Sequence, residues 1–240
     1  MKKSFTLIEL IIVLIIIGIL AFSLSFKFNN SLQVAADKLI KDLRYTQSLA
    51  LKEDKYQPFP ENNTSIEQNR SKYWFKQWWQ LKFKLSINGG NYYYSYSIFS
   101  DSPTNSTSTN FNKIGGPTSE YALNSLTNKY AATSSSLTYS KEYNLSKYNI
   151  KLIIKPNGSP YTSYNPSLRF VFDNLGNIFL DEGDAGDAGD INPLDKNKRP
   201  LLTKTAKIKL CLDNPCIQNK DRCVQINISP SGEIYKSTCN

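Results

Sequence analysis

The first 26 residues, MKKSFTLIELIIVLIIIGILAFSLSF (residues 1–26), decide how this chain is organised. Two lysines, Lys2 and Lys3, precede a largely apolar run from Phe5 to Phe26 that carries one charge, at Glu9. A helix rises 1.5 Å per residue, so this run gives about 33 Å of helix, enough to cross a bilayer. Lysines before such a segment favour a cytoplasmic N-terminus, and the rest of the chain is then expected outside the cytoplasm.

Glu9 is the unusual residue of this run. A carboxylate costs about 2.5–3.5 kcal/mol at the centre of a membrane helix and less near the interface, so Glu9 is expected to have a functional partner. The surrounding stretch, KKSFTLIELIIVLIIIGILA (residues 2–21), resembles the prepilin leader and N-terminal helix of type IV pilins and type II secretion pseudopilins.

The resemblance implies a pathway of processing and assembly. A membrane prepilin peptidase would cleave between Ser4 and Phe5 on the cytoplasmic side, and the new amine of Phe5 would be N-methylated. Glu9 would then neutralise the Phe5 amine of a neighbouring subunit, since opposite charges attract strongly where the dielectric constant is low. The family usually has glycine just before the cleavage site, where this chain has Ser4.

Two other kinds of N-terminal segment remain as alternatives. A secretory signal peptide has an apolar core of 7–15 residues followed by a small-residue cleavage site. The run here is longer, and Ala21-Phe22-Ser23 fits such a site poorly. A plain single-pass anchor would explain the apolar run, but it has no need of the Phe-Thr-Leu-Ile-Glu-Leu string around Glu9.

Residues 29–57 predict an amphipathic continuation of this helix, because they contain no proline or glycine and carry an apolar stripe. Pro58 and Pro60 supply the stop, so one helix over residues 5–56 would be about 78 Å long. The stretch AADKLIKDLRYTQSLALKED (residues 35–54) resembles the second helical half of H-class minor pseudopilins. The stripe is expected to pack on the protein's own sheet, with Lys38, Lys41, Asp42 and Lys52 mainly off it. The stripe consists of Leu32, Ala35, Ala36, Leu39, Ile40, Leu43, Ala50 and Leu51.

Strand patterns dominate the rest of the chain. Alternating apolar and polar residues around the turn Asn88-Gly89-Gly90-Asn91 predict a β-hairpin over residues 78–99. Residues 100–136 are polar and predict a loop. The remaining alternation predicts further strands over residues 150–154, 168–172, 178–180, 208–212 and 224–228, and one at Ile234.

These elements predict an α+β fold with a long N-terminal helix packed on antiparallel sheet. The stretches RFVFDNLGNIFLD (residues 169–181) and VQINISPSGEIYKS (residues 224–237) resemble the C-terminal sheet of H-class pseudopilins. The expected organisation is a leader, a transmembrane helix, its amphipathic continuation and a globular β-rich domain, over residues 1–4, 5–28, 29–57 and 58–240.

Four cysteines, Cys211, Cys216, Cys223 and Cys239, lie in the last 30 residues, which the expected topology places where disulfides persist. Three pairings exist, and hairpin geometry favours one. Cys223 and Cys239 are equidistant from Ser231 in a predicted turn, so a symmetric register places them opposite each other, within disulfide range. Cys211–Cys216 would then close a small loop. Zinc is the alternative, although Cys-x2-Cys spacings and histidines are absent from the sequence.

An acidic loop, DEGDAGDAGD (residues 181–190), is a candidate calcium site, because calcium prefers hard oxygen ligands on a flexible loop. Some pilins and pseudopilins bind calcium, so the resemblance makes this site plausible. The spacing does not match an EF-hand, and we favour a solvated acidic loop over a metal site. No other cofactor is expected. The candidate ligands are Asp181, Asp184, Asp187 and Asp190.

The sequence gives little support for an enzyme. It contains no histidine, which excludes His-dependent triads and His-ligated metals. It also contains no phosphate-binding P-loop and no Gly-rich dinucleotide motif.

The chain is basic, with a net charge of +9 that becomes +7 if Lys2 and Lys3 leave with the leader. Lysines and aromatic residues interleave in KYWFKQWWQLKFK (residues 72–84), which suits either a surface for single-stranded DNA or a sheet with buried aromatics and solvated lysines. Strict alternation favours the sheet. Glu61–Ser65 resembles an extended bacterial N-glycosylation sequon at Asn63.

The sequence therefore predicts a non-enzymatic, minor subunit of a type IV pilus or type II secretion pseudopilus. Its expected partners are other subunits, the prepilin peptidase, an inner-membrane assembly platform and membrane lipid. It would span the bacterial inner membrane once, with the globular domain in the periplasm or on the extracellular filament. The alternatives are a DNA-binding minor pilin for DNA uptake, with nucleic acid as partner, and a membrane-anchored adhesin or carbohydrate binder.

Overall fold

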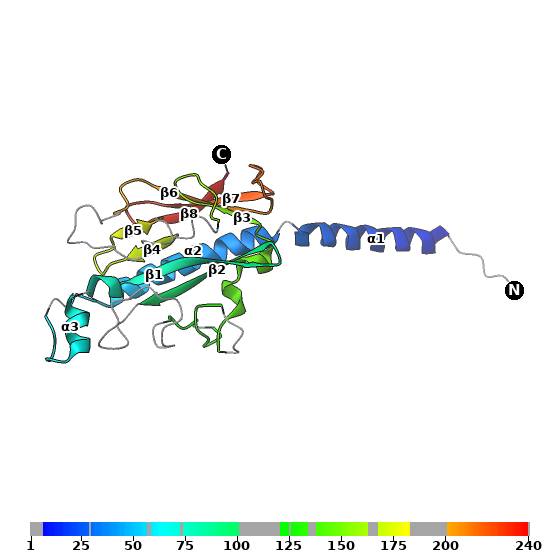
Figure 1. Cartoon of the computed structure of the whole chain (residues 1–240). Helices are drawn as coiled ribbons and strands as arrows, with labels where there is room; N and C mark the ends of the chain where they lie inside the picture. The colour runs from blue at the N-terminus through cyan, green and yellow to red at the C-terminus, as the bar shows by residue number, and fades with distance from the viewer. Residues whose placement is uncertain are drawn as a thin grey trace.

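The computed structural model describes residues 7–28, 30–56, 59–72, 74–100, 121–124, 126–133, 138–162, 168–182 and 201–239. Helix α1 (Leu7–Phe28) projects from one end of a domain that contains helix α2 (Asn30–Lys52) and two β-sheets (Figure 1). Both α1 and α2 lie within the predicted helix over residues 5–56, and Asn29 between them lies outside the described residues.

In the described part of the chain, two four-stranded sheets form the body of the domain, and every strand pairing within them is antiparallel. Their strand orders are β2-β1-β4-β5 and β3-β6-β7-β8. The strands are β1 (Trp79–Asn88), β2 (Asn91–Ser100), β3 (Leu152–Ile154), β4 (Arg169–Phe172), β5 (Ile178–Asp181), β6 (Ala206–Cys211), β7 (Cys223–Ile228) and β8 (Ile234–Thr238). The short helices are α3 (Ser65–Lys72), η1 (Trp74–Gln77), η3 (Lys141–Tyr143) and η4 (Leu145–Tyr148).

The predicted hairpins are confirmed. Asn88 pairs with Asn91, so Gly89 and Gly90 form a two-residue turn, and both have positive φ, +56° and +80°. Such a turn matches the right-handed twist of the flanking strands and favours glycine at both central positions. The β4–β5 and β7–β8 hairpins form where the sequence predicts them.

Helix α2 supplies the centre of the core with the predicted apolar stripe, except for Leu51. Leu39 is completely buried, whereas Leu51 is 54% exposed near the end of the helix. The helix ends at Lys52 rather than at residue 56, because the Asp54 carboxylate accepts a hydrogen bond from the Tyr56 backbone N–H (2.8 Å) and so forms a turn. The other stripe residues are buried against the sheets: Leu32, Ala35, Ala36, Ile40, Leu43 and Ala50.

Asp42 is buried on the inner side of α2, although the sequence analysis placed it mainly off the packing stripe. Tyr96 on β2 donates a hydrogen bond to its carboxylate at 2.6 Å, and Lys38 one turn earlier forms an ion pair with it at 2.8 Å. A buried carboxylate is tolerated only when its oxygens are paired in this way. This contact ties the helix to the first sheet.

The predicted polar loop over residues 100–136 is only partly a loop. Residues 101–120 lie outside the described part, but Tyr121, Ala122, Ala131 and Ala132 are buried. Backbone hydrogen bonds of Ala122 and Ala131 with Ile98 join this segment to β2. The local sequence gives no period-two signal here, because the segment is ordered by pairing with a distant strand rather than by its own pattern.

Two leucines of α2 give a matched test of this packing. We expect Leu39→Ala to lower the free energy of unfolding by about 2–5 kcal/mol, because it opens a cavity in the core. Leu51→Ala makes the same chemical change at an exposed site and should alter the free energy of unfolding by about 0.5 kcal/mol or less. Denaturant unfolding followed by circular dichroism measures both. Equal losses would contradict the packing described for α2.

Alkaline pH is expected to unfold the domain by ionising buried tyrosines. Burial raises the pKa of Tyr94 to about 12, and raises the pKa of Tyr96 well above its usual value with a further contribution from the Asp42 carboxylate. Burial also raises the pKa of Tyr143 and of Tyr161. Tyrosines in an unfolded chain titrate near 10, so this stabilisation is complete below about pH 10 and is lost as the pH rises further.

The ultraviolet absorbance of phenolate, recorded together with circular dichroism, tests this expectation. The buried tyrosines should ionise in one step that coincides with unfolding above about pH 10. Ionisation of all tyrosines near pH 10 with the fold intact would contradict it.

Candidate functional site

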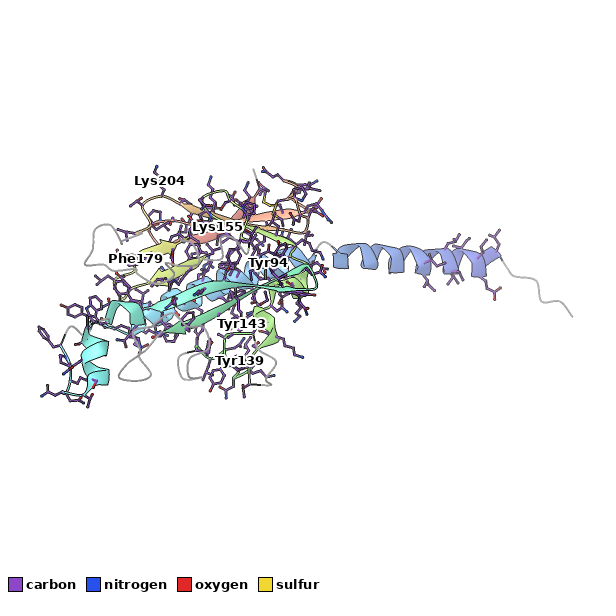
Figure 2. All side chains as sticks on the ribbon, viewed as in Figure 1. Tyr94, Tyr139, Tyr143, Lys155, Phe179 and Lys204 are labelled. Carbon is purple, nitrogen blue, oxygen red and sulfur yellow. A yellow bond between two sulfur atoms is a disulfide. The ribbon has the colours of Figure 1, made fainter. Side chains whose placement is uncertain are left out.

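Helix α1 presents an apolar surface on all of its sides. Every large apolar side chain from Leu7 to Ile19 is between 42% and 77% exposed. Figure 2 shows side chains standing away from the far part of α1, well beyond the domain. Soluble monomers rarely expose continuous apolar patches larger than a few hundred Å². A continuous apolar surface of this kind is typical of a segment that contacts a membrane or other proteins.

Glu9 lies in the first turn of α1, on the exposed surface and between the exposed Ile8 and Leu10. An acidic group at this position interacts favourably with the positive end of the helix dipole. The other two residues of the predicted processing site, Ser4 and Phe5, lie outside the described residues.

Within the described residues, no helix combines the length and the apolar character needed to cross a membrane.

The four cysteines form two disulfides, Cys211–Cys216 and Cys223–Cys239, which is the pairing that the sequence favours. The β7–β8 register places Val224 opposite Thr238, and therefore Cys223 opposite Cys239, with their Cα atoms 5.9 Å apart. Cys211–Cys216 closes the loop that follows β6, with a Cα separation of 5.4 Å.

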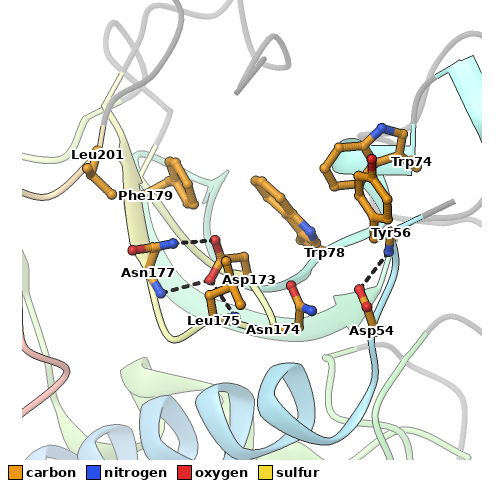
Figure 3. Close-up of a pocket in the computed structure, with 10 residues that line it drawn as sticks. All are labelled: Asp54, Tyr56, Trp74, Trp78, Asp173, Asn174, Leu175, Asn177, Phe179 and Leu201. Atoms are coloured by element: carbon orange, nitrogen blue, oxygen red, sulfur yellow. Dashed lines mark hydrogen bonds between the residues drawn. The ribbon is translucent and has the colours of Figure 1, made fainter. Parts of the chain in front are cut away.

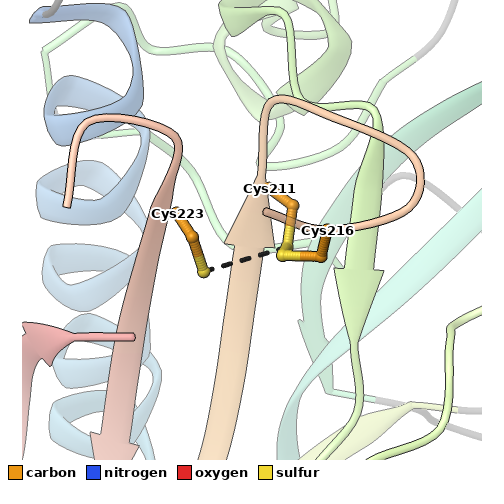
Figure 4. A group of neighbouring side chains, drawn as sticks. All are labelled: Cys211, Cys216 and Cys223. Carbon is orange, nitrogen blue, oxygen red and sulfur yellow. Dashed lines mark hydrogen bonds between the residues drawn. A yellow bond between two sulfur atoms is a disulfide. The ribbon is translucent and has the colours of Figure 1, made fainter. Parts of the chain in front are cut away.

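Three of the sulfur atoms lie close together, as Figure 4 shows. The Sγ atoms of Cys211, Cys216 and Cys223 are within 4.8 Å of one another, and Cys211 lies directly opposite Cys223 on the neighbouring strand. Their Sγ atoms are 3.9 Å apart although they belong to different disulfides. Zinc binds thiolates, and all three sulfurs are held in disulfides here, so the observed arrangement is a disulfide pair rather than a metal site.

Only the first candidate calcium ligand, Asp181, lies within the described residues; Asp184, Asp187 and Asp190 lie outside them. The Asp181 carboxylate forms an ion pair with the buried Arg169 at 2.7 Å. Glu182 follows, and its partial burial raises the pKa of its carboxyl group against the opposing effects of the Asn157 N–H and Lys155. Arg169 already neutralises the first of the four carboxylates, and calcium binding by the four stays a prediction.

Only the second half of the basic and aromatic stretch over residues 72–84 is strand, because β1 begins at Trp79, after the short helix η1. On β1, Leu81 and Phe83 are buried, whereas Lys84 is exposed. Trp79 is partly buried, and its indole N–H donates a hydrogen bond to Glu53 at 2.7 Å. Because these side chains pack inside the protein, β1 does not offer the row of exposed rings on which single-stranded nucleic acid stacks.

A cleft that the sequence analysis did not identify opens beside η1 (Figure 3). It has a volume of about 490 Å³, and its described lining includes Tyr56, Trp74, Trp78 and Phe179. The sequence places Trp74 and Trp78 in one basic and aromatic stretch, but Tyr56 and Phe179 come from distant segments. Only the density of tryptophan near residue 78 could have drawn attention to this part of the chain.

Comparison with known proteins gives a family match for the N-terminal segment alone. Residues 1–25 match the family model described as a prokaryotic N-terminal methylation motif. In this segment the chain is therefore similar to type IV pilins and pseudopilins. No significant match to the chain was found among curated proteins or among solved structures.

The close approach of the two disulfides predicts what loss of one cysteine does. In Cys216→Ser, the Cys211 thiolate lies 3.9 Å from Cys223 Sγ and attacks it, forming Cys211–Cys223 and releasing Cys239 as a thiolate. Mass spectrometry of non-reduced peptides should find the new disulfide and a free thiol at Cys239. The unchanged chain, as control, should give the two native pairs. An intact Cys223–Cys239 bond in the variant would contradict the prediction.

Proposed function

We propose that the chain is a minor structural subunit of a type IV pilus or of a type II secretion pseudopilus. The single observation that carries the proposal is the coincidence of a methylation motif at residues 1–25 with the exposed apolar surface of α1. The motif alone indicates how the N-terminus is processed. The apolar helix alone indicates that this segment has apolar surroundings. Together they describe a subunit that is held in a membrane and then transferred into a bundle of like helices.

The assignment as a minor subunit of the H class is supported by the sequence resemblance of residues 35–54 and of the two hairpins. These segments cover most of α2 and the hairpins β4–β5 and β7–β8. The fold therefore has an order of elements compatible with a pilin, with the helix first and antiparallel sheet after it.

In this proposal, prepilin peptidase cleaves between Ser4 and Phe5, and the Phe5 amine is methylated. The subunit waits in the inner membrane by residues 5–28, with its N-terminus in the cytoplasm. The assembly platform then moves it into the filament, where Glu9 pairs with the Phe5 amine of a neighbouring subunit. The two disulfides suit a domain exposed to an oxidising compartment.

The Glu9 carboxylate gives the sharpest test. We expect Glu9→Gln to weaken incorporation into filaments by about 3–5 kcal/mol, because it leaves the partner's amine buried without a counter-charge. The side chain keeps its size, so packing of the helix is preserved. Glu53→Gln, which removes an exposed acid outside α1, serves as the matched control and should assemble normally.

The measurement is the ratio of filament-bound to membrane-bound protein in shear fractions of cells, with mass spectrometry of the mature N-terminus. Methylated Phe5 should be the first residue in all assembled protein. Normal assembly of Glu9→Gln, or a mature chain that begins at Met1 or beyond α1, would overturn the proposal.

A further inference from the structure

Helix α3 and the start of β1, which flank η1, lie at the end of the domain opposite to α1 (Figure 1), and the cleft opens beside η1 (Figure 3). Trp78 stands in its middle, with Phe179 and Leu201 on one side and Trp74 and Tyr56 on the other (Figure 3). Its volume of about 490 Å³ falls in the range of small-molecule sites. Aromatic and aliphatic side chains form most of the described lining, with a few polar groups among them. The polar groups are Asp54, Asp173, Asn174 and Asn177.

Trp78 carries a hydrogen-bond donor that no described part of the chain satisfies. The side chain is 4% exposed, and its Nε1–H has no hydrogen-bond partner among the residues that the structure describes. A buried donor that stays unpaired is unfavourable, because it has lost its hydrogen bonds to water without replacement. By contrast, the neighbouring Trp79 donates its Nε1–H to Glu53. A ligand of this cleft should therefore bring an acceptor oxygen to Trp78.

Acceptors are also present, so the ligand must bring donors as well. Asp54 is exposed, and one of its oxygens accepts from the Tyr56 backbone N–H, which leaves the other oxygen for a ligand. Asn174 at the floor of the cleft is half-buried. Asp173 is already used, because it accepts from the N–H groups of Leu175 and Asn177 within its own turn.

The charge of the described lining excludes an anionic ligand. Asp54 and Asp173 are acidic, and the described lining includes no lysine or arginine. Neither carboxylate forms an ion pair within the described part of the chain. An anion would be repelled, and a simple amine would satisfy the acids but not the indole donor of Trp78.

The strand edge beside the cleft is closed to an extended peptide. Strand β5 lies at the edge of its sheet, but Phe179 forms a bridge with Leu201, and Leu202 donates its N–H to the Ile178 carbonyl at 2.8 Å. Strand addition needs these backbone groups. Recognition in the cleft is therefore left to side chains, which favours a compact ligand.

We propose that this cleft binds an uncharged carbohydrate. Sugar hydroxyls both donate and accept, so one ring can accept from Trp78 Nε1 and donate to Asp54 and Asn174. The C–H faces of the same ring pack on the aromatic walls. Trp78 Nε1 is itself buried, so binding of the sugar requires a lining side chain to move. Tyr56, which is 62% exposed and whose ring contacts Trp74 edge-on at 4.9 Å, is the most exposed aromatic residue of the lining.

All three tryptophans of the chain, Trp74, Trp78 and Trp79, lie in or next to the cleft, so tryptophan fluorescence, excited selectively over that of the tyrosines, reports on this site. The full chain is purified in a polyoxyethylene detergent, because alkyl glycosides would compete. It is titrated with trisaccharides of glucose, galactose and N-acetylglucosamine. Tetramethylammonium chloride and a trilysine peptide probe the two rival classes. At least one trisaccharide should give a saturable change, and the rivals should give none.

Two variants and a control decide whether the cleft is the site. Asp54→Ala removes an exposed acceptor, and Trp78→Phe keeps an aromatic ring but removes the N–H; each should weaken binding about tenfold. Tyr92→Ala changes an exposed tyrosine at the β1–β2 turn, toward the α1 end, and should bind normally. Circular dichroism checks that each variant folds. If Trp78→Phe does not fold, Asp54→Ala alone decides the test.

The proposal is overturned if no trisaccharide gives a saturable change, or if the ammonium salt or the peptide binds as tightly as the best sugar. Unchanged sugar affinity in Asp54→Ala would overturn it as well. These outcomes are independent of filament assembly, because none of the variants touches α1.

Discussion

The apolar surface of α1 is the constraint on which the rest of the structure depends. Side chains from Leu7 to Ile19 are exposed on every side of the helix, and the helix projects away from the domain (Figure 1). Burying one leucine or isoleucine side chain is worth about 1.5–3 kcal/mol, while a whole domain is stable by only about 5–15 kcal/mol. The free energy gained by burying the apolar side chains of α1 in lipid or among like helices is therefore comparable to the whole free energy of unfolding of a domain. The domain itself must be stable without the contribution of α1.

The domain meets this requirement through α2, which packs against strands of both sheets. Leu39 and Leu43 are completely buried in its contact with the sheets. The buried Asp42 adds a directional contact, because its carboxylate accepts from Tyr96 at 2.6 Å. Apolar packing alone tolerates sliding of a helix along a sheet, whereas this hydrogen bond fixes one position. Lys38 supplies a positive charge that offsets the free-energy cost of burying the Asp42 carboxylate.

Local signals made much of the fold predictable. Hairpins β1–β2 and β7–β8 were predictable because period-two alternation and the turn residues lie within one short stretch. The disulfide Cys223–Cys239 followed from the symmetry of the second of these hairpins. The order of strands was not predictable, because β4 pairs with β1 from a distant part of the chain. Neither strand carries a sequence signal that identifies its partner. The inward position of Asp42 was missed for the same reason, because its partner Tyr96 lies on another element. The cleft could not be predicted from the sequence for the same reason, because its walls come from segments that only the fold brings together.

The cleft also differs from the rest of the interior. Trp78, Val171 and Phe179 form an apolar cluster of their own, with Trp74 packed against it and separate from the main core around α2. Side chains in a small separate cluster can shift without opening the main core, and distant sites usually act independently. The proposed assembly through α1 and the proposed sugar binding at the opposite end of the domain could therefore be varied separately.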